Sequence, residues 1–347
     1  MDKIKIGVVG AGNISTNAHL PAYAKYDGAS VEAICDTVPE RAKTAAERFN
    51  IPRWYGSVEE MLEGCELDAV DICTWNNGHS TVAVSAACAG KHIMCEKPMA
   101  RTMTEAQAMA DAVRNNKVKF MLAVPNRSCG ENRKARELIE SGALGDIYFA
   151  RTSAVRRRGT PTGWFTDFKT SGGGPIIDIG VHRIDAAWYL MGCPKPVSVT
   201  AATSNRIGDY QTKGVGRWQG TPCPDNKFDV EDSGAGCIRF ENGAIMLFEA
   251  TWAINAPDSS ETLVCGSKAG IRLSPLTVFG EKDDYLSDEK IDAHADGEDV
   301  FLNEIEAFCD YLRGKCPSRV PLDQALTLQS MLNAAYESAK TGKEIIL

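Results

Sequence analysis

The sequence predicts an α/β fold in two domains: a parallel, doubly wound sheet, then an α+β domain with a large, mostly antiparallel sheet. Up to about residue 125, short apolar runs alternate with helix-like segments, which is typical of parallel sheets. A glycine-rich turn follows the first of these runs. Beyond that point strand-like segments dominate, and Asn242–Gly243 between two β-prone runs predicts a hairpin. We therefore expect domains at 1–125 and 126–347.

In the first domain, the sequence predicts strands that alternate with helices. Its predicted strands are Ile4–Val9, Val31–Cys35, Ala69–Thr74, His92–Cys95 and Lys119–Val124. Its predicted helices are Ile14–Tyr26, Pro39–Phe49, His79–Ala89 and Thr104–Asn115. Short continuous apolar runs of this kind suit strands that are covered by helices on both faces.

The second domain mixes strands with fewer helices. A second hairpin is predicted between Leu263–Gly266 and Ile271–Leu273. The predicted helices are Glu131–Glu140, Ile177–Met191, Phe301–Arg313 and Leu322–Thr341. We expect these helices to cover one face of the antiparallel sheet.

The turn Gly10–Ser15 follows a strand and opens a helix, as phosphate-binding turns do. Gly10 allows the tight turn, and Gly12 lets the backbone approach a pyrophosphate. Ser15 stands where the third glycine of the G-x-G-x-x-G pattern is usual, and a small side chain can serve there. The phosphates would lie at the helix N-terminus, so we expect Gly10, Gly12, Asn13 and Ile14 to bind a dinucleotide. A plain βα turn is the alternative.

Asp36 ends the next predicted strand. A carboxylate there accepts hydrogen bonds from the ribose hydroxyls and repels a 2′-phosphate, which favours NAD over NADP. Arg41, a few residues on, could tolerate a phosphate or lie on a solvated helix face.

Two further segments carry candidate chemistry. Glu96–Lys97–Pro98 ends a predicted strand, at the sheet edge where ligands bind in open α/β sheets. Asp178 and His182 are four residues apart, so a helix places them on one face, where the pair suits acid–base work. A local Asp–His pair is the alternative, and the glycines at 172–174 would let a substrate approach the helix start.

A metal site is a minority alternative for the same segment. Asp178, His182 and Asp185 have helical ligand spacing, but no Cys or His cluster completes a site, so we expect no metal. His19, His92 and His294 show no partner in the sequence and are expected to be structural or exposed.

Together these segments resemble the Gfo/Idh/MocA oxidoreductase family, and the resemblance covers nearly the whole chain. It rests on Gly10-x-Gly12, Asp36, Thr74-x-Asn76-x-x-His79, Glu96–Lys97–Pro98, Gly174-x-x-x-Asp178-x-x-x-His182 and the tail Tyr336–Ala339 before Thr341–Lys343. The resemblance implies a Rossmann domain, NAD(P), and hydride transfer at a hydroxyl-bearing carbon of a sugar or cyclitol. It also implies a homo-oligomer (a dimer, tetramer or higher) formed sheet to sheet.

The resemblance also assigns roles. It makes Lys97, Asp178 and His182 the catalytic set, with Glu96 and Lys97 at the nicotinamide ribose. Thr74, Asn76 and His79 join the cofactor-binding residues on the same ground.

Four residues are candidates for substrate contacts besides Asp178 and His182. Asn126 and Arg127 follow the last strand of the first domain, and an inter-domain hydrogen bond is their alternative role. Arg156, in the run Arg156–Arg158, either lines the substrate site or lies on a solvated turn. Trp164 offers a flat ring that can stack on a pyranose or an aglycone.

Composition excludes several classes. The net charge of −8, without a basic tail, excludes wholesale binding of nucleic acid or an anionic membrane. The N-terminus enters a strand directly, with no signal peptide and no membrane span, so we expect a cytoplasmic protein. The 12 cysteines are scattered without a CxxC pair, which predicts buried free thiols.

The leading prediction is an NAD-dependent oxidoreductase acting on a secondary hydroxyl of a sugar, glycoside or cyclitol. One alternative is an NAD-dependent glycosidase that oxidises its sugar transiently. Another is a non-catalytic NAD-sensing regulator, although such a protein need not keep both Lys97 and His182.

Overall fold

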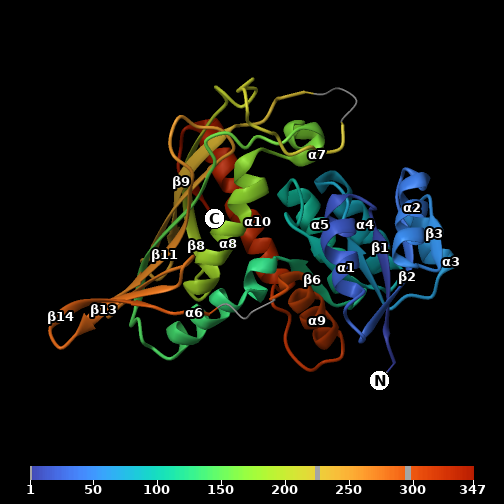
Figure 1. Ribbon diagram of the computed structural model, residues 1–347, viewed down its shortest axis with the longest axis horizontal. Coiled ribbons are helices and arrows are strands. Elements are labelled where there is room, and N and C mark those ends of the chain that lie inside the picture. The colour runs from blue at the N-terminus through green and yellow to red at the C-terminus, as the bar shows by residue number, and fades with distance from the viewer. Residues whose placement is uncertain (1, 223–226, 294–297) are drawn as a thin grey trace. The chain divides into compact units, whose positions relative to one another are not determined.

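The structure is a computed structural model that describes residues 2–222, 227–293 and 298–347. His294, expected to be structural or exposed, lies outside the described residues. The chain packs as two compact units (Figure 1). The first is the chain up to Ser128 together with Asp299–Leu326, and the second is Cys129–Glu298 together with Thr327–Leu347.

The first unit is built on a six-stranded sheet in the order β3-β2-β1-β4-β5-β6. Its strands are β1 (Ile4–Val9), β2 (Ala29–Cys35), β3 (Arg53–Tyr55), β4 (Ala69–Ile72), β5 (His92–Glu96) and β6 (Phe120–Ala123). All neighbouring strands are parallel, so the predicted doubly wound sheet is confirmed. The strand order reverses between β1 and β4, which is where such sheets bind ligands.

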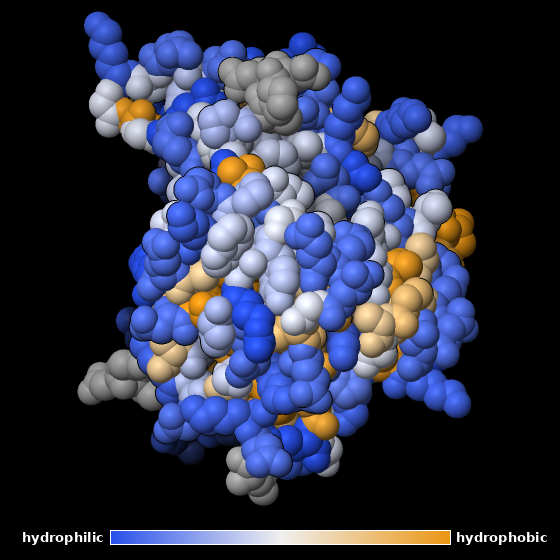
Figure 2. Space-filling view, turned by 90° about the vertical axis from the view of Figure 1, so that its right-hand side faces the viewer, coloured by the Kyte–Doolittle hydropathy of each residue, from blue (hydrophilic) through white to orange (hydrophobic). Residues whose placement is uncertain are grey.

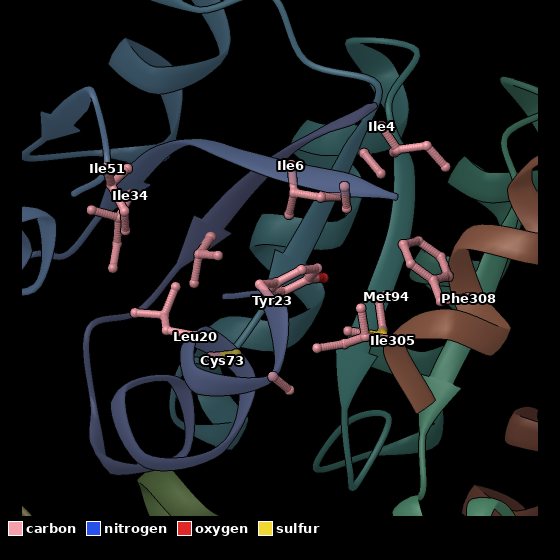
Figure 3. Close-up of a cluster of buried hydrophobic side chains, with 14 of the residues drawn as sticks. Ile4, Ile6, Leu20, Tyr23, Ile34, Ile51, Cys73, Met94, Ile305 and Phe308 are labelled. Atoms are coloured by element: carbon pink, nitrogen blue, oxygen red, sulfur yellow. The ribbon is translucent and has the colours of Figure 1, made fainter. Parts of the chain in front are cut away.

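Helices of the first unit follow its strands in the βα alternation. They are η1 (Ser15–His19), α1 (Leu20–Tyr23), α2 (Pro39–Phe49), α3 (Val58–Gly64), α4 (Asn76–Cys88), α5 (Met103–Asn115), η2 (Pro125–Ser128) and α9 (Val300–Leu312). Alternate residues of β1, Ile4, Ile6 and Val8, share one face and belong to one buried cluster with residues of α1, α2 and α9. Figure 3 shows Ile4 and Ile6 in this cluster. This core holds β1 in place, and the glycine-rich turn follows the carboxyl end of that strand.

The tail divides differently from the expected domains 1–125 and 126–347. Helix α9 packs in the first unit, where Ile305 and Phe308 join the core beside Ile4 and Met94 (Figure 3). An amphipathic helix must bury its apolar stripe, but its sequence does not say against which core. The helix was predicted correctly, whereas its membership of the second domain was not.

The second unit contains a nine-stranded sheet in the order β14-β13-β12-β11-β7-β10-β9-β8-β15. Its strands are β7 (Ile147–Val155), β8 (Pro196–Ser204), β9 (Ser233–Phe240), β10 (Ile245–Thr251), β11 (Ser259–Gly266), β12 (Gly270–Arg272), β13 (Thr277–Lys282), β14 (Tyr285–Lys290) and β15 (Ile345–Ile346). Only β7 and β10 pair in parallel; the other neighbours are antiparallel. Both predicted hairpins, β9–β10 and β11–β12, are confirmed.

The remaining helices accompany this sheet. They are α6 (Gly130–Glu140), η3 (Gly163–Thr166), α7 (Phe168–Ser171), η4 (Ile176–Gly180), α8 (Val181–Leu190) and α10 (Leu322–Thr341). Helix α8 packs on β7, β10 and β11 and buries Trp188. The segment η4–α8 is the glycine-led helix that the sequence predicts.

The face drawn in Figure 2 is mainly hydrophilic, with apolar residues in small separate patches. None of the described helices is both long enough and apolar enough to cross a bilayer. Every cysteine in the described ranges carries a free thiol. The prediction that these thiols are buried is correct for Cys35, Cys73 and Cys95, whereas Cys88 is exposed.

Candidate functional site

The predicted phosphate turn starts at Gly10, directly after β1. The Gly10 N–H donates to the Cys35 carbonyl oxygen at 2.8 Å, and its φ of +101° belongs to the region that glycine tolerates best. A Cβ at this position would lie 2.6 Å from the Cys73 carbonyl oxygen. Gly10 is therefore required by the packing of β1 against the chain after β4.

Gly12 faces open space instead. A Cβ there would meet no atom within 4 Å, so this glycine leaves room in front of the helix that begins at Asn13. The Ser15 hydroxyl is buried and donates to the Gly12 carbonyl oxygen at 2.9 Å. This hydrogen bond satisfies the hydroxyl and explains how a serine replaces the third glycine. The turn and the free N–H groups of the helix start fit a dinucleotide pyrophosphate.

Asp36 is tied to the same turn. Its Oδ2 accepts the Ala11 N–H at 2.8 Å, and its Oδ1 accepts the Val38 N–H at 2.8 Å. A carboxylate oxygen can accept more than one hydrogen bond, so the predicted ribose contact remains compatible with these two. Arg41 lies exposed on α2.

The segment after β4 is connected to the Lys97–Pro98 turn through His79. This buried ring on α4 places Nδ1 2.8 Å from the Pro98 carbonyl oxygen and Nε2 3.2 Å from the Thr74 carbonyl oxygen. Burial lowers the pKa of His79. Asn76, also buried, is the first residue of α4. His79 thus joins two of the segments that the sequence assigned to the cofactor.

Glu96 is buried at the end of β5, and Lys97 beside it is half-buried. The Glu96 Oε2 accepts the Lys97 backbone N–H at 3.0 Å, and Oε1 lies 2.9 Å from His19 Nε2. Burial alone would raise the pKa of Glu96, but the hydrogen bond and charge of His19, with the Lys97 charge, outweigh burial and lower this pKa. Glu96 is therefore an anion that is hydrogen-bonded to the Lys97 backbone.

Arg127 contacts other residues of the first unit. It is buried in η2, and its Nη1 donates to the Arg319 carbonyl oxygen at 2.9 Å and to Gln324 Oε1 at 2.5 Å. Asn126 is half-buried on the same turn. Their predicted substrate contacts stay predictions.

In the second unit, Asp178 and His182 lie four residues apart on the continuous helical segment η4–α8, as predicted. Both are half-buried. The Asp178 Oδ2 accepts the indole N–H of the fully buried Trp252 at 3.1 Å. A π-helical turn, a feature that is frequent at functional sites, carries Asp178.

The start of this helix is held by Glu231, which the sequence analysis missed. Its carboxylate accepts the Gly174 N–H at 2.9 Å, the Ile176 N–H at 3.2 Å and the Tyr336 hydroxyl at 2.8 Å. A Cβ at Gly174 would lie 2.1 Å from the Glu231 carbonyl oxygen, and one at Gly173 would lie 2.2 Å from the Tyr336 hydroxyl oxygen. The expectation that these glycines admit substrate is wrong, because Glu231 and Tyr336 fill that space.

The other substrate candidates of the second unit lie before this helix. Trp164 is half-buried in η3 and stacks on Phe165, with ring centroids 3.9 Å apart. Arg156 is exposed, and its Nη1 lies 3.5 Å from the Gly159 carbonyl oxygen. Trp164 is therefore packed against a neighbouring ring, while Arg156 lies on an exposed turn.

Metal binding at Asp178, His182 and Asp185 finds no support. Within the described ranges, one group of His, Cys, Asp and Glu side chains is close enough to share an ion, namely His19, Asp71 and Cys73. His19 was expected to be structural or exposed; it is buried beside two acids. A signal was present, since Asp71 is an acid inside an apolar strand and must find a partner there.

Both units match one family. Residues 4–124 match the Gfo/Idh/MocA oxidoreductase family with an NAD-binding Rossmann fold, and residues 132–272 match the Gfo/Idh/MocA C-terminal domain. D-glucoside 3-dehydrogenase of Escherichia coli is 32% identical, over 99% of this chain and 97% of that protein. The chain belongs to the Gfo/Idh/MocA family. The predicted class, an NAD-dependent oxidoreductase, is confirmed.

Two further relatives are informative. Levoglucosan dehydrogenase of Pseudarthrobacter phenanthrenivorans is 33% identical, over 72% of this chain and 68% of that protein. A structure of levoglucosan dehydrogenase with NADH and levoglucosan superimposes with a TM-score of 0.85 and 27% identity, covering 99% of both chains. Myo-inositol 2-dehydrogenase of Thermotoga maritima is 28% identical, over 82% of this chain and 75% of that protein.

Proposed function

We propose that this chain is an NAD-dependent dehydrogenase that oxidises a secondary hydroxyl of a sugar, glycoside or cyclitol. The observation that carries the proposal is the half-buried Asp178–His182 pair on one helical segment, in a chain with a dinucleotide turn at Gly10–Ser15. A carboxylate beside an imidazole suits removal of a hydroxyl proton near neutral pH. The relatives named above act on glucosides, levoglucosan and inositol, which supports the substrate class.

Each residue has one proposed task. His182 takes the proton of the substrate hydroxyl, and Asp178 orients either that hydroxyl or the His182 ring. Lys97 donates a hydrogen bond to the oxygen as it becomes negative, which stabilises the developing charge. The nicotinamide supplies the hydride acceptor when it is bound.

The substrate contacts are proposed for Asn126, Arg127, Arg156 and Trp164. A flat indole such as that of Trp164 can pack against the apolar face of a sugar ring, and its stacking on Phe165 keeps the ring in place. NAD is the proposed cofactor in preference to NADP, because a 2′-phosphate would be repelled by the Asp36 carboxylate.

A substrate screen tests the function. The purified protein is incubated with NAD and, in parallel, NADP against alkyl and aryl glucosides, levoglucosan, free hexoses and inositols. We expect NADH formation with at least one of them. Release of aglycone without net NADH would identify the transient-oxidation glycosidase instead. Binding of NAD without turnover of any sugar would identify the regulator.

Variants then test the residues. Lys97→Ala and His182→Ala are each expected to lower kcat about 100-fold or more, because positioned acid–base and charge-stabilising groups contribute on that scale. The Kd for NAD, measured by fluorescence, should stay within about threefold in His182→Ala. Lys91→Ala, at the other end of β5, is the matched control and should retain full activity. Unchanged turnover in either variant removes that residue from the mechanism.

We also propose that the protein forms a homo-oligomer through the nine-stranded sheet. Strands β7 and β10 expose Tyr148 (58%) and Leu247 (39%), which suits contact with a second copy. Light scattering after gel filtration should show a dimer or a larger multiple, and a monomer at micromolar concentration would contradict this.

The free thiols of the described cysteines support the proposed cytoplasmic location.

A further inference from the structure

A buried charged cluster lies inside the first unit, outside the predicted site. His19 is the last residue of η1, Asp71 belongs to β4, and Glu96 ends β5. All three side chains are buried, with residue exposures of 1%, 0% and 5%. His19 Nδ1 lies 2.8 Å from Asp71 Oδ2, and Nε2 lies 2.9 Å from Glu96 Oε1. Groups this costly to bury need a reason in packing or function.

The geometry identifies the ring as an imidazolium. A neutral imidazole donates from one nitrogen only, whereas both nitrogens of His19 face a carboxylate oxygen. Burial alone would lower the pKa of His19, but the negative charge and hydrogen bond of Asp71 raise it well above its usual range. His19 therefore connects two anions from neighbouring strands.

The cluster continues to Lys97. One oxygen of Glu96 contacts His19, and the other accepts the backbone N–H of Lys97 at 3.0 Å. The Glu96 carboxylate is thus fixed at both oxygens. A carboxylate fixed in this way holds the backbone at the point where the Lys97 side chain starts.

Cys73 joins the cluster from the chain after β4. Cys73 Sγ lies 3.6 Å from His19 Nδ1, and ligand-type atoms of His19, Asp71 and Cys73 lie within 4.8 Å of one another. Burial, together with the Asp71 charge, raises the pKa of Cys73 to about 12, so the thiol keeps its proton. In the imidazolium, Nδ1 carries a proton that is directed at Asp71 Oδ2. Hydrogen bonds satisfy the ring without an ion.

The groups that face His19 from other elements are also identifiable. Helix α9 contributes the Phe301 ring, 5.9 Å away between centroids, and the buried Glu304. Helix α1 contributes Tyr23, which lies with Cys73 in the core drawn in Figure 3. Glu304 acts on the cluster through its charge when ionised, since Glu96, His19 and Asp71 all influence its pKa.

We propose that His19 is a positioning residue for the reaction: it fixes Glu96, and through Glu96 the backbone of Lys97. The proposal rests on the proposed catalytic role of Lys97. His19 touches neither substrate nor cofactor in this assignment. By fixing the Lys97 backbone, His19 limits the positions that the Lys97 ammonium group can occupy.

Two amide substitutions separate the two sides of the ring. His19→Gln places a donor near the position of Nε2 and keeps a hydrogen bond to Glu96, whereas His19→Asn places one near Nδ1 and keeps only the Asp71 side. We expect His19→Asn to lower kcat by about 10- to 100-fold, the scale of a lost hydrogen bond to a charged group. His19→Gln should recover most of that loss, while the KM for sugar changes little in both. A purely structural role predicts equal losses in the two variants.

Hydrogen exchange gives a readout that does not need activity. Pro98 has no amide, so the difference between a peptide ending at Glu96 and one ending at Pro98 reports the Lys97 amide alone. We expect this amide to exchange about 10-fold faster or more in His19→Asn, and much less so in His19→Gln. His92→Gln, at the far end of β5, is the matched control and should change neither exchange nor kcat.

The outcomes separate the two proposals. Equal kcat in the Asn and Gln variants, or unchanged Lys97 exchange in His19→Asn, overturns the inference about His19. If His19→Asn does not fold, Glu96→Leu, which removes the acceptor, takes its place, and unchanged exchange at Lys97 there overturns the inference as well. If the wild-type protein oxidises no sugar, the proposed function fails, and the exchange measurement still decides the inference.

Discussion

The two units hold their candidate residues in different ways. In the first unit, the glycine turn is fixed at its own backbone N–H groups: the Gly10 N–H donates to the Cys35 carbonyl oxygen, and the Ala11 N–H donates to the Asp36 carboxylate. In the second unit, Asp178 depends on side chains from distant parts of the chain, namely Trp252 and, at the helix start, Glu231. A turn fixed at its own backbone N–H groups can be predicted from a motif, whereas side chains that are positioned by distant side chains cannot.

The largest expected effect comes from removing Glu231, the distant side chain that holds the start of the helix carrying Asp178. Glu231→Ala leaves the Gly174 and Ile176 N–H groups and the Tyr336 hydroxyl without their acceptor. Since each unsatisfied buried group costs about 1–3 kcal/mol, we expect the free energy of unfolding to fall by about 3–5 kcal/mol. Urea unfolding measures this, and kcat should fall as well because Asp178 loses its helix start.

Glu241→Ala is the matched control, since Glu241 is exposed beside the β9–β10 turn and should change stability by less than about 0.5 kcal/mol. If Glu231→Ala lowered the free energy of unfolding by less than about 1 kcal/mol, the helix start would not depend on the Glu231 carboxylate.

The second-largest effect separates the roles of the two glycines in the Gly10–Ser15 turn. Gly10→Ala forces a Cβ to within 2.6 Å of a backbone oxygen at φ +101°, so we expect a loss of stability of about 2–3 kcal/mol. Gly12→Ala meets open space, so stability should change by less than about 1 kcal/mol. Its Cβ would stand where the pyrophosphate approaches, and the Kd for NAD should rise about 10-fold or more.

Thermal unfolding and NAD titration of the two variants check this contrast. Similar losses of stability and of NAD affinity in both would contradict the division into a structural and a binding glycine.

These contrasts show how far the sequence determines the molecule. The first unit's strands were predicted nearly to the residue, because βα alternation and the glycine turn are local signals, and only the short edge strand β3 (Arg53–Tyr55) was missed. The hairpin at Asn242–Gly243 was predicted for the same reason, since turn chemistry decides it. The meeting of Lys97 with His182 stays a prediction.

The supporting residues escaped prediction because their partners lie far away in sequence. Nothing local links Trp252 to Asp178, 74 residues apart, or Glu231 to Tyr336, 105 residues apart. The unit to which α9 belongs was misjudged because a helical pattern does not identify its core. The acid inside β4 was the one local sign of the His19 cluster.

A smaller effect isolates one hydrogen bond to Asp178. Trp252→Phe removes the indole N–H and keeps most of the buried ring, so we expect kcat to fall about 10- to 30-fold, in the range of hydrogen bonds to charged groups. Steady-state kinetics on the best substrate measure this, with NAD affinity unchanged. Trp188→Phe is the matched control, because this equally buried indole donates to the Pro194 carbonyl oxygen at 2.8 Å.

Both variants should lose similar stability, and only Trp252→Phe should lose turnover. Equal kcat values in the two would show that Trp252 supports the fold alone.

A pH-dependent effect compares two buried acids. Glu231 in the second unit accepts three hydrogen bonds, whereas Glu304 in the first lies among the charges of Glu96 and Asp71. Burial first, and then those negative charges, raise the pKa of Glu304 from 4.5 to about 8. The folded protein therefore binds one more proton than the unfolded chain between these values, and its stability falls as pH rises through them.

Glu304→Gln removes this proton difference. Relative to wild type, the free energy of unfolding of the variant should rise by up to about 1.4 kcal/mol per pH unit between about pH 5 and 8, and level off above. Urea unfolding across this range measures the difference. Parallel stability curves for the two proteins would show that Glu304 already ionises near its ordinary pKa.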